Sequence, residues 1–219
     1  MADVLNAGRV ELVDSMGSDM SVVRAARISN GAAMPEWRGA PDERLIQFLA
    51  KNKHLSPFEH ATFTFYVKAP IFVIREWQRH RTLSYNELSA RYKELKPEFF
   101  MPDAPRVQDP KNKQSSVEVD AEAMLVNMRV YMRHAYEQAD EWYRKLLAAG
   151  IAREIARSVL PVGIYSEMYV TGNFRNWMQW FDLRSTPEAQ AEIRQYAYAI
   201  APYLVAKMPL SFQAWMDAR

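Results

Sequence analysis

The order of apolar and polar residues along the chain predicts a mixture of strands and helices. Residues 8–14, GRVELVD, alternate apolar and polar side chains as a half-buried strand does. Residues 61–69, ATFTFYVKA, and 164–172, IYSEMYVTG, are rich in β-branched and aromatic residues, which favour strands. Residues 18–29, SDMSVVRAARIS, show a helical spacing that begins with a serine or aspartate cap.

Caps and prolines predict where the other helices begin and end. We expect a helix from residue 40 to the break at Ser56 and Pro57, and another from Pro70 through residue 81. Asn173 is expected to open a helix that reaches residue 184. Three more helices are expected over 117–149, from 151 to before Pro161, and from the cap Thr186 and Pro187 to 208. Helices therefore dominate, with a few strands between them, so the predicted class is α+β.

The predicted helix over 117–149 carries an apolar stripe. Its members recur mostly every three or four residues: Met124, Met128, Tyr131, Ala135, Trp142 and Leu146. This pattern is typical of a helix face that packs in a core or against another subunit. The preceding residues 99–120 hold three prolines and many polar groups, which predict a surface loop or lid inserted into one domain, 1–219.

Composition excludes several classes of protein. The 219 residues are 49% hydrophobic. The 28 basic and 26 acidic side chains leave a net charge of only +2, whereas a protein that coats nucleic acid usually has a larger positive excess. No apolar run has membrane-spanning length and no secretory signal opens the chain, so we expect a cytoplasmic protein. The absence of cysteine excludes disulfides, thiolate metal ligands and a cysteine nucleophile. Neither metal-binding histidine spacing nor a glycine-rich phosphate loop is present.

The densest group of polar side chains lies in residues 79–93, RHRTLSYNELSARYK. On the helix before it, Arg75 and Arg79 are four residues apart and share a face, with Gln78 beside them. Arginine forks bind phosphate and carboxylate, and Ser84, Asn86 and Ser89 add donors for a heterocyclic ring, so a phosphorylated, ring-bearing ligand fits. A solvated basic helix end is the alternative. If residues 87–92 are extended, Glu87, Ser89 and Arg91 face one way while Leu88, Ala90 and Tyr92 face the other.

These residues resemble a known family. RHRTLSYNELSARY matches the pattern R-H-R-x-x-S-x-N-E-x-S-x-R-Y of the flavin-dependent thymidylate synthases at every fixed position from Arg79 to Tyr92. The resemblance extends over HLSPFEHATFTFYVKAPIFVIREWQRHR, EIARSVLPVGIY, GNFRNWMQWFDLR and AQAEIRQYA. It implies helices around a central, mainly antiparallel sheet, and a homotetramer with active sites shared between subunits.

The resemblance implies an enzyme that methylates dUMP reductively to dTMP. Methylenetetrahydrofolate (5,10-methylenetetrahydrofolate) would supply the carbon, FAD would carry the hydride and NADPH would reduce the flavin, with no metal. The matched segments assign to FAD the residues His54, Ser56, Arg79, His80, Arg81, Glu87, Asn173, Phe174, Arg175 and Gln179. They assign to dUMP the residues Glu76, Trp77, Gln78, Arg79, Glu87, Leu88, Ser89, Ala90, Arg91, Arg157 and Arg184. Glu76 stands where many members carry glutamine.

Arg184 is the expected catalytic residue. Without a cysteine to add to the pyrimidine, activation must be electrostatic, and an arginine near N3 favours the electron-rich, N3-ionised ring. Ser84 and Ser89 are the remaining hydroxyl candidates, and we expect Ser89 to position dUMP. Two other functions stay open: a single-strand nucleic-acid binder that uses the arginines and tyrosines of the segment, and a flavoprotein with altered chemistry.

Overall fold

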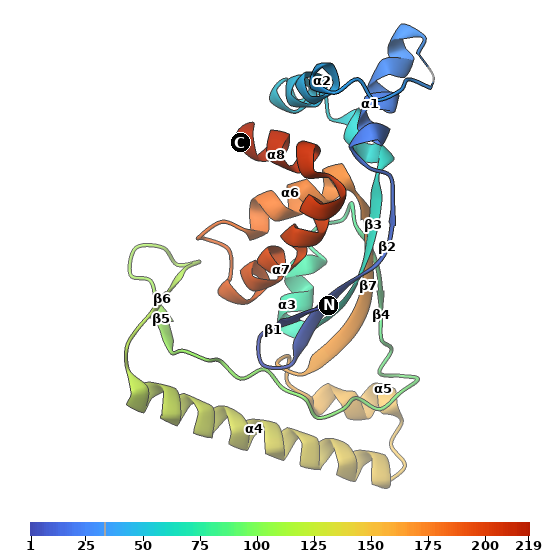
Figure 1. Cartoon of the computed structure of the whole chain (residues 1–219). Coiled ribbons are helices and arrows are strands. Elements are labelled where there is room, and N and C mark those ends of the chain that lie inside the picture. Colours follow the sequence, from blue (N-terminus) through green and yellow to red (C-terminus); the bar gives the residue numbers. More distant parts are fainter. Residues whose placement is uncertain (33) are drawn as a thin grey trace.

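A twisted, antiparallel sheet forms the centre of the protein. The computed structural model describes residues 1–32 and 34–219 (Figure 1). The sheet has the order β1-β2-β3-β7-β4, and every neighbouring pair is antiparallel. Its strands are β1 (Ala2–Val4), β2 (Gly8–Met16), β3 (Thr62–Pro70), β4 (Ser84–Glu87) and β7 (Tyr165–Asn173). The predicted α+β class and the mainly antiparallel sheet are confirmed.

Helices cover one face of this sheet. Figure 1 shows α3 (Ile71–Trp77), α6 (Phe174–Arg184), α7 (Ala191–Lys207) and α8 (Pro209–Asp217) on one side of the strands. At one end of the sheet lie α1 (Asp19–Arg27), α2 (Ala40–Lys51) and two short 3-10 turns, η1 (Ile28–Asn30) and η2 (Ser56–His60). Among the described residues, no helix is both long and apolar enough to cross a bilayer.

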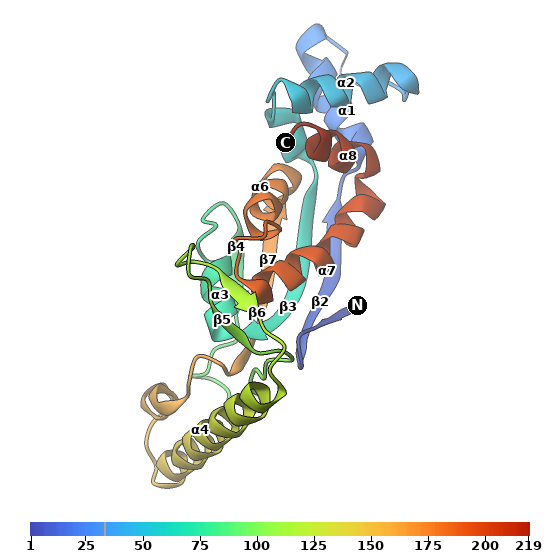
Figure 2. The ribbon, with the colours of Figure 1, turned by 90° about the vertical axis from the view of Figure 1, so that its left-hand side faces the viewer.

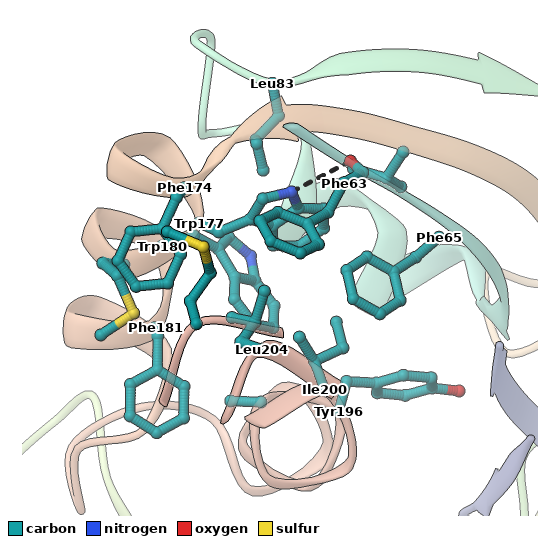
Figure 3. Close-up of a cluster of buried hydrophobic side chains, with 14 of the residues drawn as sticks. Phe63, Phe65, Leu83, Phe174, Trp177, Trp180, Phe181, Tyr196, Ile200 and Leu204 are labelled. Carbon is teal, nitrogen blue, oxygen red and sulfur yellow. Dashed lines mark hydrogen bonds between the residues drawn. The ribbon is translucent and has the colours of Figure 1, made fainter. Parts of the chain in front are cut away.

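Buried residues alternate with partly buried ones along the strands, and the buried side chains form one side of the core. Phe63, Phe65 and Val67 of β3 are fully buried, and the residues between them are only partly buried, as one-sided covering of a sheet requires. Indole rings of α6 fill the space above them: Trp177 packs on Phe65 and donates to the carbonyl of Phe63 at 3.2 Å (Figure 3). Burial of such large rings contributes most of the stabilisation.

A second group of elements extends away from the sheet. The long helix α4 (Glu122–Ala148) lies at the opposite end of the molecule from α1 and α2 (Figures 1 and 2). The short α5 (Arg153–Ala156) and the 3-10 turn η3 (Arg157–Val159) follow it. Only Tyr143 of α4 is buried, while Tyr131 is 73% and Trp142 is 53% exposed. The predicted apolar stripe therefore does not pack in the core of the subunit.

Several sequence-based expectations were wrong, among them the start of the helix expected over 117–149, which begins at Glu122 because residues 116–118 form a strand. The helix expected through residue 81 ends at Trp77, because the chain makes tight turns from Trp77 to His80 and from His80 to Leu83. The expected loop over 99–120 contains a hairpin of β5 (Arg106–Gln108) and β6 (Ser116–Glu118). The helix expected from Thr186 begins at Ala191, after a turn in which the Ala189 amide donates to the Thr186 carbonyl.

Candidate functional site

Three side chains from two distant parts of the chain meet at the end of α3. Arg184, the last residue of α6, donates from Nη1 to the Glu76 carboxylate at 2.7 Å and from Nη2 to the Glu76 carbonyl at 2.9 Å. Its Nε donates to Nε2 of His80 at 2.8 Å. The Arg184 side chain is 15% exposed and that of Glu76 is 38% exposed, so the cluster is half open to solvent. The structure thus brings together the expected catalytic residue, one residue expected to bind dUMP and one expected to bind FAD.

Burial and, to a smaller extent, the charge of Arg184 favour the neutral form of His80. Burial, and then the nearby guanidinium, lower the pKa of His80 to about 4. A ring nitrogen of histidine accepts a hydrogen bond only when it is unprotonated, which agrees with the bond from Arg184. Tyr85 supports the same turn, donating to the Trp77 carbonyl at 2.5 Å and the His80 carbonyl at 3.0 Å. Burial raises the pKa of Tyr85, so this hydroxyl stays protonated.

The second half of the 79–93 segment forms an edge strand and a turn. β4 ends at Glu87, whose carboxylate accepts a hydrogen bond from Gln78 at 3.4 Å. Leu88 continues onto the neighbouring strand by donating its amide to the Glu167 carbonyl at 2.8 Å. The chain then turns, because the amides of Tyr92 and Lys93 both donate to the Ser89 carbonyl. Residues 87–92 are therefore not extended throughout. The alternation of side chains expected for an extended segment ends at Leu88.

The turn after β4 contacts the segment that carries another expected dUMP residue. Arg91 Nε lies 3.0 Å from the Glu154 carboxylate of α5, and Arg153 of α5 lies 3.7 Å from Glu94. Arg157 follows α5 directly and is exposed. These contacts place the 88–94 turn beside the Arg157 segment on the same side of the molecule.

A separate group of expected FAD residues gathers where α6 begins. The Asn173 side chain accepts a hydrogen bond from the Asn176 amide at 2.9 Å and so caps α6, as its position predicted. Arg175 pairs with Glu59 of η2 at 2.5 Å, while His54 and Ser56 lie exposed at and just before the start of η2. Asn176 donates to the Thr82 carbonyl at 2.9 Å, joining α6 to the loop that holds Arg79, His80 and Arg81.

Three expected ligand contacts have buried side chains. Trp77 and Phe174 are fully buried and Ala90 is 6% exposed. Trp77 stacks on Trp180 with ring centroids 4.2 Å apart, and Phe174 packs on Phe58. Ligand contacts at these positions can involve backbone atoms only. By contrast, Arg79, Arg81, Arg91 and Arg157 are exposed, and Gln179 is half-buried on α6.

Sequence reasoning missed three residues that shape the site. Tyr85 supports the turn before β4, Asn176 ties that turn to α6, and Glu59 pairs with Arg175. Tyr85 lies at a variable position of the matched pattern, and Asn176 follows directly after three assigned residues in GNFRN. The sequence around Glu59 does not indicate its role, because its partner Arg175 lies 116 residues away.

The hollow beside β4 is small. A cavity of about 290 Å³ is lined by Tyr66, Asn86, Glu87, Leu88, Glu167, Met168 and Tyr169. A larger cavity of about 620 Å³ lies between the β5–β6 hairpin and the start of α7, and none of the expected site residues lines it. The subunit's own walls beside Glu87 and Leu88 thus enclose less space than a dinucleotide would fill.

Comparison with known proteins identifies the family. The family model described as thymidylate synthase complementing protein matches residues 11–210. The flavin-dependent thymidylate synthase of Thermus thermophilus is 46% identical over 98% of this chain and 77% of its own length. That of Thermosipho africanus is 43% identical over 97% of this chain and 92% of its own length.

A solved structure agrees in both fold and sequence. The UMP/dUMP methylase PolB of Streptomyces cacaoi, bound with 5-Br dUMP, superposes with a TM-score of 0.90 at 38% identity, over 99% of this chain and 97% of the other. Its complex with 5-Br UMP superposes with a TM-score of 0.88. With a family match from residue 11 to residue 210 and these full-length relatives, the chain belongs to the flavin-dependent thymidylate synthase family.

Proposed function

We propose that this protein methylates dUMP to dTMP reductively, with 5,10-methylenetetrahydrofolate as carbon donor and with FAD and NADPH as the redox pair. The observation that carries the proposal is the cluster of Arg184, Glu76 and His80, which joins the matched signature to the matched C-terminal segment. Family membership and the nucleotide-bound neighbours support the same reaction.

The residues around α6 and the 79–83 loop fit a flavin dinucleotide. Exposed Arg79 and Arg81 offer guanidinium groups to a pyrophosphate, and such forks bind phosphate oxygens in pairs. Arg175 and the exposed His54 and Ser56 lie at the other end of the same surface, across the bond from Asn176 to Thr82. When bound, FAD would supply the redox chemistry of the methyl transfer. We therefore assign to FAD these five residues together with His80, Glu87, Asn173, the Phe174 backbone and Gln179.

The proposed dUMP site lies between α3, the turn after β4 and the end of α6. Arg91 and Arg157 would bind the phosphate, since both are exposed and lie on segments tied by the ion pair from Arg91 to Glu154. Ser89 and the backbone from Glu87 to Ala90 would hold the sugar and phosphate. Arg184, Glu76 and Gln78 would face the base, with Trp77 limited to its backbone.

Arg184 is the proposed catalytic residue. The chain contains no cysteine, so no thiolate can add to C6 of the pyrimidine. A guanidinium held by three hydrogen bonds is a fixed donor, and a fixed cationic donor beside N3 and the ring oxygens would stabilise the electron-rich, N3-ionised ring from which C5 attacks the one-carbon unit. Electrostatic activation of the pyrimidine by the oriented Arg184 guanidinium would thus replace covalent activation by a cysteine.

We propose that four subunits assemble and share their active sites. The α4 helix exposes Met124, Tyr131 and Trp142 on one face, and an exposed apolar stripe of this kind is typical of a subunit contact. A neighbouring subunit would also complete the walls of the site, since the cavity beside Glu87 holds only about 290 Å³.

One preparation tests the proposed function. The purified protein should show the visible absorption of bound flavin, and it should form dTMP from dUMP, methylenetetrahydrofolate and NADPH. It should also oxidise NADPH in air without folate, because a reduced flavin lacking an acceptor reacts with oxygen. A colourless protein whose nucleic-acid binding weakens steeply with salt would instead support a single-strand binder. A yellow protein that forms no dTMP would indicate altered flavoprotein chemistry.

A further inference from the structure

The last turn of α6 is held from two sides. On one side Arg184 donates to groups at the end of α3. Asp182 lies two residues earlier, and side chains two residues apart on a helix do not share a face. Its Oδ2 accepts the indole N–H of Trp215 in α8 at 2.8 Å, and its Oδ1 accepts Nε–H of Arg219 at 2.7 Å. The end of α6 therefore joins α3 to α8, which lies next to it in Figure 1.

The charge of Asp182 indicates that it serves the contact with α8. The C-terminal end of a helix carries partial negative charge, so a carboxylate in its last turn is unfavourable for the helix itself. The indole and the guanidinium offset this cost, because each binds one oxygen of the carboxylate. Trp215 is buried, so the bond from its indole is shielded from water.

The residue that follows Arg184 is fixed in the same way. Ser185 ends α6 by donating its amide to the Phe181 carbonyl at 2.9 Å. Its Oγ accepts from Nη2 of Arg219 at 3.2 Å, and its carbonyl accepts from the Tyr198 hydroxyl of α7 at 3.3 Å. The backbone before and after Arg184 is thus tied to α7, to α8 and to Arg219.

Helix α8 is itself anchored, so it can act as a support. The buried Asp19 of α1 accepts the amides of Leu210 at 3.0 Å and Ser211 at 2.9 Å, and also the Ser211 hydroxyl at 2.6 Å. Trp215 packs edge to face on Phe58, with ring centroids 6.1 Å apart. Both ends of α8 are therefore fixed against the rest of the chain.

We propose that Asp182 is a positioning residue for Arg184: its carboxylate fixes the last turn of α6 against Trp215 and Arg219, and so directs the Arg184 guanidinium toward the turn after α3. Asp182 acts through Arg184 and contacts no substrate. A displacement of about 1 Å at a reacting group can cost about 10²-fold in rate, so the support of this turn matters for the reaction. The inference rests on the proposed function, since it requires Arg184 to activate the pyrimidine.

The test compares the natural chain with Asp182→Ala in two reactions of the flavin-loaded protein. With saturating dUMP, kcat for dTMP formation should fall by about tenfold or more, because the guanidinium loses its orientation. The KM for dUMP should change less than about twofold, since the proposed phosphate contacts lie on other segments. NADPH oxidation in air, without dUMP or folate, should keep its rate because it needs no activated pyrimidine.

Three further variants sharpen the comparison. Asp182→Asn keeps an oxygen that accepts the Trp215 indole, so its kcat should exceed that of Asp182→Ala. Arg219→Ala removes one hydrogen bond to Asp182 from an exposed side chain and should lower kcat by about threefold. Asp217→Ala is the matched control, because this exposed aspartate of α8 accepts only from Gln213 of its own helix, and it should leave both reactions unchanged.

The outcomes separate the two proposals. If the natural chain forms no dTMP, the proposed function falls and this inference with it. If the natural chain forms dTMP and both Asp182→Ala and Arg219→Ala keep its kcat, the inference alone is wrong. An equal loss of methylation and of NADPH oxidation would contradict it as well, since that result would assign Asp182 to the stability of the whole subunit. Should Asp182→Ala fail to fold in urea titrations, the ratio of the two reactions in Arg219→Ala decides.

Discussion

Arg184 donates from Nε to Nε2 of His80 across 2.8 Å, which joins the last residue of α6 to the turn after α3. The two residues are 104 positions apart in the sequence. Their bond fixes the plane of the guanidinium, and it requires a neutral imidazole. The orientation of the proposed catalytic arginine is therefore coupled to the protonation state of a residue in the signature segment.

This coupling predicts a dependence of stability on pH. The pKa of His80 is about 4 in the folded protein and about 6.5 when the ring is unperturbed. Between these values the unfolded chain binds a proton that the folded chain does not, so the free energy of unfolding should decrease as pH falls from 6.5 toward 4. His80→Gln keeps an acceptor without titrating, so its urea unfolding should lose stability less steeply over that interval. Replacement of the exposed His134 of α4 by glutamine is the matched control and should leave the slope unchanged.

Arg184→Ala should greatly reduce methylation. Removal of one fixed donor to a developing oxyanion typically costs about 10²- to 10³-fold in kcat, and Arg184→Ala removes two free N–H groups together with the charge. Arg184→Lys should recover little of the rate, since an ammonium cannot reproduce the planar fork that binds Glu76 and His80. Rates of dTMP formation with saturating dUMP measure the effect. Near-normal turnover of either variant would remove Arg184 from the mechanism.

Ser89→Ala should keep a sizeable part of the turnover. Ser89 Oγ accepts the backbone amide of Arg91 at 3.3 Å, a contact that shapes the turn rather than activating a nucleophile. Loss of a true serine nucleophile costs about 10⁶-fold in a serine hydrolase, so a decrease of that size would contradict a positioning role. The measurement is kcat and KM for dUMP, with Ser84→Ala on the exposed side of β4 as the matched control.

Asn173→Ala should weaken both the fold and the flavin site. The side chain accepts from the Asn176 amide at the start of α6, and loss of such a cap costs about 1 kcal/mol in the free energy of unfolding. Asn173→Asp keeps the cap, so denaturant unfolding should separate the stability effect from the loss of FAD binding. Equal unfolding midpoints for the alanine variant and the natural chain would show that the cap contributes nothing.

Charged substitutions on α4 should disrupt the proposed tetramer without unfolding the single chain. Tyr131→Glu combined with Trp142→Glu places carboxylates on an exposed apolar surface, so the helical signal should persist while sedimentation detects species smaller than a tetramer. Arg133→Glu, which changes an exposed charge elsewhere on the same helix, should leave the assembly intact. A tetramer that survives the double substitution would locate the contact elsewhere.

Local patterns predicted much of the fold. The strand expected over 164–172 is β7, and the strand expected over 61–69 is β3. Both could be predicted because a strand that is buried on one face selects residue types that the local sequence shows. The helix opened by Asn173 ends at Arg184 as expected, since the cap is formed within four residues. The end of α3 was misplaced by four residues, because burial of Trp77 and the Tyr85 hydroxyl bond to its carbonyl stop the helix there.

The sequence by itself determined the class of fold, most of the strands and helices, the family resemblance and the identity of the polar groups available for chemistry, because these depend on residue type and on contacts within a few positions. Only the tertiary structure decided which of those groups meet. It paired Arg184 with Glu76 and His80, buried Trp77 and Phe174 in the core, and left the apolar stripe of α4 exposed. The pairing of Arg184 and the burial of the two rings depend on contacts between segments far apart in the chain, which the local sequence pattern does not reveal. The periodic pattern of α4 indicated an apolar face, but not whether this face would be covered within the chain.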